Sequence, residues 1–348
     1  MTTLRFALTG LGRVGRAFLE LVRSREALLQ ARYGLSLRAV GVADAGGAAW
    51  DPGGLEVAAI AACKAAGGSV ARLRGCGHAG VSARALVDVV EADLLLEATP
   101  SGPADGQPGL DVVRAALART MHVVMASKGP LVRAFAELAG RSDLAGGRGP
   151  KLRFSGAVGG ALASVNLGRR DLAGGRIGRV EAVLNATTQV VLGLRAQGLG
   201  REAALAEAQR LGLAEPDATL DLEGWDAASK LVILANAVLG RPTALGDVAV
   251  RGIAGVEDAA LRAASAAGGR VSLLATAEAV GEDYRLAVAP AVLPGEHPLA
   301  RLGEGELGIV YESDLFGRTV LTSRADGPVG TAAAMLRDVL EIAGQRAG

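Results

Sequence analysis

The feature that most constrains this chain is a glycine-rich turn between two apolar segments near its N-terminus. Residues 4–9 read as a buried strand, and residues 14–22 carry apolar positions at helical spacing. Between them, Gly10, Gly12 and Gly15 fit the pattern G-x-G-x-x-G. Such glycines allow a tight turn, a close backbone approach to a pyrophosphate and close helix packing, while the helix N-terminus attracts the phosphate. The pattern in this context predicts a dinucleotide site.

An acidic residue, Asp44, follows the second expected strand at residues 37–43. An acid at this place commonly accepts hydrogen bonds from the adenosine ribose, and it repels a 2′-phosphate. NAD is therefore favoured over NADP, although Arg13 could contact phosphate and oppose that preference. The separation from Gly15 exceeds the usual spacing of about 20 residues, which implies a longer first helix or loop. The alternative is that Asp44 only caps the turn that follows it.

Strands and helices alternate through the first third of the chain. Further strands are expected at 94–98 and 122–126, with a crossover helix at 110–119. This alternation predicts an α/β protein whose N-terminal half is a doubly wound parallel sheet of the Rossmann type. We expect a dinucleotide-binding domain over residues 1–145.

The regular alternation of strands and helices ends at the glycine-rich segment 142–150. We expect a second, α+β domain for substrate binding and dimerisation over residues 150–321. The last helix should return to the first domain, so that residues 322–348 pack on it. The expected strands are 179–187, 271–280, 284–292 and 308–313, and the expected helices are 201–211, 226–239 and 329–343.

Bulk composition excludes several classes of function. The chain has 348 residues and a net charge of +1, so charge favours neither nucleic acid nor a membrane surface as a partner. No apolar run reaches the roughly 18 residues that a membrane span needs. Residues 1–9 lack the apolar core of a signal peptide, and Cys63 and Cys76 do not form a secreted disulfide pattern. We expect a cytoplasmic protein with reduced thiols.

Charged residues gather in the segment 215–230, directly before the apolar run 231–235. Asp226 and Lys230 are four residues apart and share one face of the expected helix. The apolar run would bring that face toward a packed interior, where charges are costly unless they are paired or used. The segment therefore indicates a site rather than a solvated loop, which is the alternative for any single run of charges.

The chain resembles homoserine dehydrogenases of the short form, which lack a C-terminal regulatory domain. The resemblance covers essentially the whole chain in the right order, and the segment 215–230 is its most specific part. The other matching segments are residues 97–100, 123–130, 240–243, 247–248, 251–253, 297–299 and 330–332.

This resemblance implies NAD(P)-linked interconversion of L-homoserine and L-aspartate 4-semialdehyde, a step of threonine and methionine biosynthesis. It implies an acid/base role for Lys230, oriented by Asp226, and a second ammonium role for Lys128. Glu215 and Asp221 are expected to bind the substrate ammonium, and Lys128 is also a substrate-binding candidate. The cofactor-binding candidates are Gly10, Gly12, Arg13, Val14, Gly15, Asp44, Thr99, Pro100, Ser127 and Lys128.

Three positions depart from the family pattern. Ser127 replaces the asparagine that commonly precedes the first lysine, and Gln189 ends a stretch that is usually Gly-Thr-Thr-Asn. Ser155 occupies the place of a glutamate associated with a sodium site. The backbone carbonyls of Val158 and Gly160 could still supply ligands, so a sodium ion is only weakly expected.

Two other readings stay open. An enzyme like aspartate-semialdehyde dehydrogenase would need an acylating cysteine in the substrate half, but Cys63 and Cys76 both precede the boundary. A catalytically altered nucleotide-binding or regulatory protein is the second alternative, favoured by the departures above and opposed by the retention of both lysines. The open sheet of the second domain is expected to leave an apolar face uncovered in a monomer, which favours a symmetric homodimer.

Overall fold

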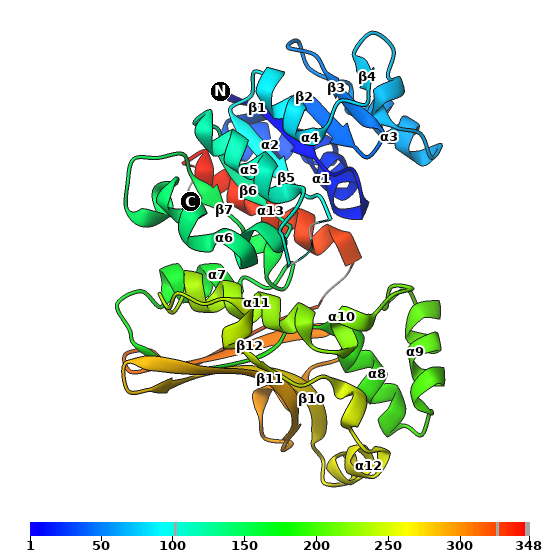
Figure 1. The fold of residues 1–348 in the computed structure, drawn as a ribbon, viewed down its shortest axis with the longest axis vertical. Coiled ribbons are helices and arrows are strands. Elements are labelled where there is room, and N and C mark those ends of the chain that lie inside the picture. Colours follow the sequence, from blue (N-terminus) through cyan, green and yellow to red (C-terminus); the bar gives the residue numbers. More distant parts are fainter. Residues whose placement is uncertain (101, 103, 325–326, 345–348) are drawn as a thin grey trace. The chain divides into compact units, whose positions relative to one another are not determined.

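The computed structural model describes residues 1–100, 102, 104–324 and 327–344. The chain divides into two compact units, shown in Figure 1. The first contains the chain up to Gly160 together with the C-terminal helix, and the second begins at Ala161. The segment 322–348, which the sequence places on the first domain, includes residues 325–326 and 345–348, and these lie outside the described residues.

The first unit is built on a seven-stranded sheet within the described residues. Its strand order is β4-β3-β2-β1-β5-β6-β7. These strands are β1 (Thr2–Thr9), β2 (Leu35–Asp44), β3 (Gly47–Trp50), β4 (Gly77–Ala79), β5 (Leu94–Glu97), β6 (His122–Met125) and β7 (Leu152–Arg153). The helices of the unit are α1 (Arg13–Ser24), α2 (Glu26–Tyr33), α3 (Val57–Ala65), α4 (Ala83–Val89), α5 (Gly109–Ala118), α6 (Gly129–Gly140) and α13 (Gly327–Ile342).

This sheet confirms the predicted α/β class. The strands β2, β1, β5, β6 and β7 run parallel, and β3 and β4 extend the sheet by antiparallel pairing. Every residue of β5 is buried, because the layers on both faces of the sheet cover it. The chain turns to opposite sides of β1 to form β2 and β5, so β1 marks the point where the strand order reverses. Ligands of open α/β sheets bind beyond the carboxyl ends of the strands at such a point.

The C-terminal helix α13 belongs to the core of the first unit. Met335 and Val339 of α13 pack in one apolar cluster with Phe6 and Leu8 of β1 and Phe18 of α1. The sequence places the end of the first domain between residues 145 and 150. The compact unit instead continues to Gly160, because β7 adds a strand to the sheet. That strand is only two residues long and leaves no periodic signal in the sequence.

The second unit contains a six-stranded sheet within the described residues, with the order β13-β12-β8-β10-β11-β9. Its strands are β8 (Ile177–Val183), β9 (Ala249–Val250), β10 (Arg270–Val280), β11 (Asp283–Leu293), β12 (Glu306–Ser313) and β13 (Gly317–Arg324). Its helices are α7 (Ser164–Asn166), α8 (Ala186–Ala196), α9 (Arg201–Arg210), α10 (Thr219–Leu222), α11 (Trp225–Ala237) and α12 (Asp258–Ala266). The helices α8, α11 and α12 all contact β10, which fits the predicted α+β arrangement.

One boundary of the second unit differs from the prediction. The sequence predicts a strand over 179–187, but β8 ends at Val183 and α8 begins at Ala186. The side chain of Asn185 accepts a hydrogen bond from the Thr188 N–H at 2.9 Å, which caps the helix. Two β-branched threonines favour a strand by propensity, but this cap places them in the first turn of the helix instead.

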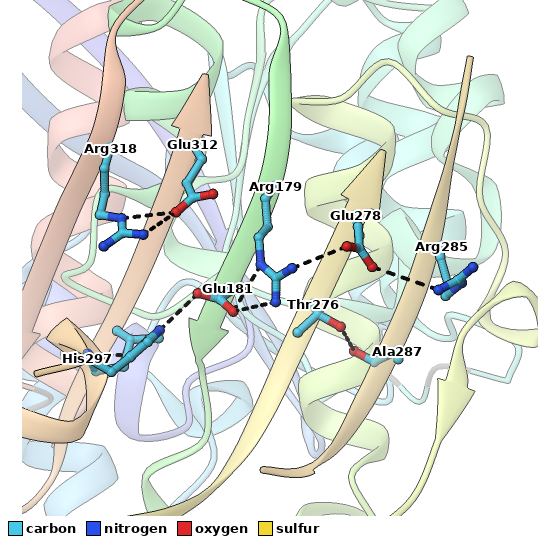
Figure 2. A network of polar contacts seen from close by, with 10 residues as sticks. Arg179, Glu181, Thr276, Glu278, Arg285, Ala287, His297, Glu312 and Arg318 are labelled. Atoms are coloured by element: carbon cyan, nitrogen blue, oxygen red, sulfur yellow. Dashed lines mark hydrogen bonds and ion pairs between the residues drawn. The ribbon is translucent and has the colours of Figure 1, made fainter. Parts of the chain in front are cut away.

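The sheet face on which Arg179 lies carries a row of alternating charges, seen in Figure 2. Arg179 stands beside Glu312 of β12 on one side and Glu278 of β10 on the other. The same register continues to Arg318 of β13 and Arg285 of β11. Directly opposed charges of opposite sign stabilise neighbouring strands. The face that the sequence predicts to be apolar is therefore charged along this row.

The same face is covered by packed apolar residues at its other end. Val183, Leu274 and Val310 form a buried cluster with Leu299 and Leu302, which belong to the connection between β11 and β12. No helix within the described ranges combines the length and apolar character needed to cross a lipid bilayer.

A buried carboxyl group joins α13 to the segment that follows β7. Asp338 is fully buried, and one of its oxygens accepts a hydrogen bond from the Ser155 N–H at 2.8 Å. The Ser155 hydroxyl also donates to this carboxylate. Burial raises the pKa of Asp338 to about 6, against an ordinary value of 3.8.

We expect Asp338→Asn to change how stability depends on pH. The folded protein holds the Asp338 proton more tightly than the unfolded chain, so the contribution of this group is largest below pH 3.8 and is lost as pH rises through about 6. The melting temperature of the variant, relative to the parent, should therefore rise between those two pH values. Thermal unfolding followed by circular dichroism measures this difference.

Ser155→Ala is the matched control for this prediction. It removes a hydroxyl that favours the ionised carboxylate, so the pKa of Asp338 should rise further and the loss of stability should extend to higher pH than in the parent. A melting-temperature difference between Asp338→Asn and the parent that is constant across this range would contradict the assignment.

Candidate functional site

The glycine turn after β1 is tightly packed at two of its three glycines and open at the third. Gly10 has a φ of +89°, and a Cβ atom there would lie 2.3 Å from the carbonyl oxygen of Ala98. A Cβ at Gly15 would lie 2.1 Å from the carbonyl oxygen of Gly10. At Gly12, directly before α1, the Cβ position has no atom within 4 Å. Two of the glycines thus permit close packing, and the third leaves open backbone for a ligand.

Asp44 lies at the end of β2, as predicted, but its carboxylate is engaged within the unit. One oxygen accepts hydrogen bonds from Lys64 Nζ at 2.7 Å and from the Val70 N–H at 3.1 Å. The other accepts from the Ser69 hydroxyl at 2.6 Å and the Gly46 N–H at 3.0 Å. Burial raises the pKa of Asp44, but these hydrogen bonds outweigh it and hold the pKa below its ordinary value.

These contacts give Asp44 a structural role that the sequence shows only in part. The side chain is 8% exposed, and its four acceptor positions are largely used. The cap predicted as the alternative is present, because Gly46 is one of the donors. Lys64 and Ser69 were not predicted, since contacts across 20 and 25 residues leave no pattern in the sequence.

A buried glutamate organises the loops after β5 and β6. Glu97 is fully buried and accepts a hydrogen bond from the Thr99 N–H at 2.8 Å. The hydroxyl groups of Thr99 and Ser127 also donate to it. Burial raises the pKa of Glu97. The structure thus brings together two predicted cofactor-binding residues through a carboxyl group whose role was not predicted.

The other predicted cofactor-binding residues of the first unit follow the carboxyl ends of β1, β5 and β6. Arg13 begins α1 and is exposed, whereas Val14 is half-buried. Pro100 is exposed after β5, and Lys128 is half-buried directly before α6.

The pair Asp226–Lys230 lies at the start of α11, in the second unit. The Lys230 Nζ is 2.6 Å from Asp226 Oδ2. It also donates to the carbonyl oxygen of Leu184, at the end of β8, at 2.6 Å. The two side chains are only 13% and 16% exposed. The structure thus contains the expected pairing of Lys230 with Asp226, and the acid/base role of Lys230 stays a prediction.

Asp221 joins this cluster from the short helix α10. The side-chain amide of Asn185 donates to Asp221 Oδ1 at 2.7 Å and to Asp226 Oδ2 at 2.8 Å. Burial and the charge of Asp226 raise the pKa of Asp221, while the Asn185 hydrogen bond opposes the rise. Asn185 is buried and was not among the predicted site residues. In the sequence, Asn185 is recognisable at most as a turn residue. Nothing in the pattern indicates its contacts with Asp221 and Asp226, which lie 36 and 41 residues away.

Glu215 differs from the other predicted acids. Its side chain is exposed on the segment before α10. It takes no part in the hydrogen bonds among Asn185, Asp221, Asp226 and Lys230. Its backbone carbonyl accepts from the Gln209 side chain at 3.2 Å, which ties the segment to α9. Glu215 is therefore available to a ligand, but the cluster of Asp221, Asp226 and Lys230 does not hold it in place.

The segment proposed for a sodium ion supplies few ligands. Ser155 uses both its N–H and its hydroxyl to hydrogen-bond Asp338, so this position contributes no anionic oxygen. Val158 is buried, and Gly160 has a φ of +58°. Within the described part of the chain, no group of three or more His, Cys, Asp or Glu side chains is placed to hold a metal ion.

Comparisons with known proteins agree with this geometry. The chain is 33% identical over 336 residues to a homoserine dehydrogenase of Methanocaldococcus jannaschii, covering 96% of this chain and 97% of that protein. It is 34% identical over 345 residues to an NAD(+)-dependent homoserine dehydrogenase of Pseudomonas canavaninivorans, covering 98% and 97%. The crystal structure of a homoserine dehydrogenase from Thiobacillus denitrificans superposes with a TM-score of 0.82 at 27% identity, covering 98% of this chain and 73% of that one.

A family model completes the assignment. The model described as homoserine dehydrogenase matches residues 164–340, which include the Asp226–Lys230 pair and most of the second unit. The relatives extend the match over the first unit and its glycine turn. The chain belongs to the homoserine dehydrogenase family, a family of nicotinamide-dependent oxidoreductases of amino-acid biosynthesis.

Proposed function

We propose that this chain interconverts L-homoserine and L-aspartate 4-semialdehyde, with Lys230 as the acid/base group. The observation that carries the proposal is the placement of the Lys230 ammonium. Its contacts with Asp226 and the carbonyl of Leu184 account for two of its three N–H groups. The third is left to donate to a substrate oxygen.

Lys230 would move one proton in each direction of the reaction. When the aldehyde is reduced, negative charge develops on its oxygen, and the Lys230 ammonium donates a proton to it. When the alcohol is oxidised, the neutral amine takes the hydroxyl proton. Asp226 and Leu184 hold Nζ in one position for both directions. The nicotinamide, when bound, supplies or accepts the hydride.

The substrate is an amino acid, so its ammonium group needs carboxylates. We assign this role to Asp221 and Glu215, and we assign to Lys128 a second ammonium role in proton transfer or substrate anchoring. Asp221 supports the proposal because it is buried beside the catalytic pair. Glu215 supports it through its exposure, which leaves the carboxylate free to meet a ligand.

The first unit would hold the cofactor through the glycine turn and the strand ends. Open backbone at Gly12 suits the pyrophosphate, and the loops of Thr99 and Ser127 are held by Glu97. We propose NAD as the preferred cofactor, because Asp44 places a carboxylate at the end of β2. Lys64 opposes this preference, because its positive charge beside Asp44 would attract a 2′-phosphate.

Two further expectations depend on the second unit and on the segment after β7. We propose a symmetric homodimer through the outer face of the sheet, on which alternating Arg and Glu residues can meet their opposites in a second copy. We derive no step through a sodium ion, because Ser155 supplies no anionic ligand and Val158 and Gly160 would contribute backbone carbonyls alone.

Lys230→Ala tests the acid/base role. Turnover should fall by on the order of 10²-fold or more with little change in cofactor affinity, because proton transfer is lost and the first unit is untouched. The absorbance of the reduced nicotinamide, with homoserine and each cofactor in turn, measures the rate. Lys151→Ala is the matched control, since that half-buried lysine also donates to a carbonyl, of Ile342. An unchanged kcat in Lys230→Ala would refute the assignment.

Glu215→Ala and Asp221→Asn separate the two candidate ligands of the substrate ammonium. Both should raise the KM for homoserine, because each removes a protein carboxylate that would attract the substrate ammonium. Asp221→Asn should have the larger effect, since its charge is buried and poorly screened. Steady-state kinetics at saturating cofactor measure KM. A change confined to the KM of the cofactor would count against both roles.

Asp44→Ser tests the cofactor preference. The ratio of kcat/KM for NAD to that for NADP should fall, because a charge that repels a 2′-phosphate is removed. Asp51→Ser, which alters an exposed acid directly after β3, is the control and should leave the ratio unchanged. If the ratio in Asp44→Ser stays at the parent value, the adenosine pocket lies elsewhere and Asp44 only anchors residues 64–70.

A further inference from the structure

The turn between β8 and α8 contacts every charged member of the cluster around Lys230. Leu184 accepts from Lys230 Nζ, and the next residue, Asn185, donates to both Asp221 and Asp226. Two consecutive residues therefore hold three side chains that come from α10 and α11. The Leu184 carbonyl faces the ammonium, and the Asn185 amide faces the two carboxylates.

The orientation of the Asn185 amide is set by its other hydrogen bond. Its Oδ1 accepts from the Thr188 N–H at 2.9 Å, so the opposite atom of the amide must be the nitrogen. That nitrogen has two N–H groups, and both are used: one for Asp221 at 2.7 Å and one for Asp226 at 2.8 Å. The residue is 4% exposed, and its amide nitrogen has no N–H group left for water or another partner.

Two carboxylates close to each other repel, and their repulsion is strong where water is excluded. The charge of Asp226 raises the pKa of Asp221, and the Asn185 hydrogen bond lowers it. On Asp226, Asn185 binds the oxygen that also accepts from Lys230. The amide thus fixes the direction of the carboxylate that orients the ammonium, and it lessens the repulsion from the second carboxylate.

We propose that Asn185 is a positioning residue for the reaction, which bridges the carboxylates of Asp221 and Asp226 and so holds Lys230 in its reactive position. This inference rests on the proposed function of Lys230. Asn185 acts through the two acids and need not touch the substrate. A simple helix cap would require only its Oδ1, whereas the bridge requires both N–H groups of Nδ2.

Two substitutions separate the bridge from the cap. Asn185→Ser keeps an oxygen that caps α8, because serine is a good N-cap, but it removes both amide N–H groups. Asn185→Asp keeps the cap and the size of the side chain, but it replaces the donor with a third carboxylate. Asn236→Ser is the matched control, since that asparagine of α11 donates to the carbonyls of Val232 and Thr243, which are not members of the cluster.

The kinetics should distinguish these variants. For Asn185→Ser we expect kcat for homoserine oxidation to fall by about tenfold to 10²-fold, with the melting temperature and the KM of the cofactor close to the parent values. For Asn185→Asp we expect a larger fall in kcat and a shift of the acidic limb of the pH–kcat profile to higher pH. One of three adjoining carboxyl groups must then keep its proton to a higher pH.

A double-variant cycle tests whether Asn185 acts through Asp226. The loss of kcat in Asn185→Ser with Asp226→Asn should be smaller than the product of the two single losses, because both remove the same orientation of Lys230. The proposal would be overturned if the loss of kcat in the double variant equalled the product of the two single losses. So would parent-like kcat and pH profiles in Asn185→Ser and Asn185→Asp, since the residue would then be only a cap.

Failure to fold is also informative. If Asn185→Asp does not fold, Asn185→Ser carries the test alone; if Asn185→Ser also unfolds, the residue is structural and the proposal fails. Lys230→Ala is assayed beside them. Retained turnover in Lys230→Ala rejects the proposed function itself, whereas loss there with normal turnover in Asn185→Ser rejects only the positioning role.

Discussion

A charged pair at the edge of the second core is the interaction on which the functional argument depends. Removing an ammonium and a carboxylate from water costs several kcal/mol per ion, and their attraction repays this only with good geometry and further hydrogen bonds. Lys230 has the Leu184 carbonyl as such a partner, and Asp226 has the Asn185 amide. The cost of burial is thus met by groups in the turn between β8 and α8 rather than by the pair alone. This explains why a motif that is local in the sequence needs a distant turn to become a site.

Much of the first unit could be predicted because its central strands are covered on both faces. β5, most of β6 and the second half of β1 are short buried runs bounded by turn residues. The edge strand β13 was missed because all its residues are at least partly exposed, so neither its composition nor a buried stripe sets it apart. The helix α8 was missed because the threonines at its start favour a strand, and only the Asn185 cap reverses that preference.

The candidate site was predictable where its chemistry is local. Asp226 and Lys230 are one helical turn apart, and three glycines lie within six residues, so spacing alone gave both motifs. Asn185 is separated from Asp226 by 41 residues, and Ser127 from Glu97 by 30. Contacts of this kind depend on which strands become neighbours, and periodicity contains no information about them. The contacts of Asp44 show the same limit, because its position was predicted and its partners were not.

The position of Leu184 and Asn185 directly after β8 links the proposed chemistry to strand alignment. A shift of β8 by one residue against β10 and β12 would turn its side chains to the opposite face and move the two positions that follow it along the sheet by about 3.3 Å. The carbonyl would then leave the ammonium and the amide would leave the carboxylates, while most of the backbone pairing could re-form. Substitutions deep within the strands, such as one that displaces Val180 or Ala182, could thus silence turnover in a protein whose secondary structure still looks intact.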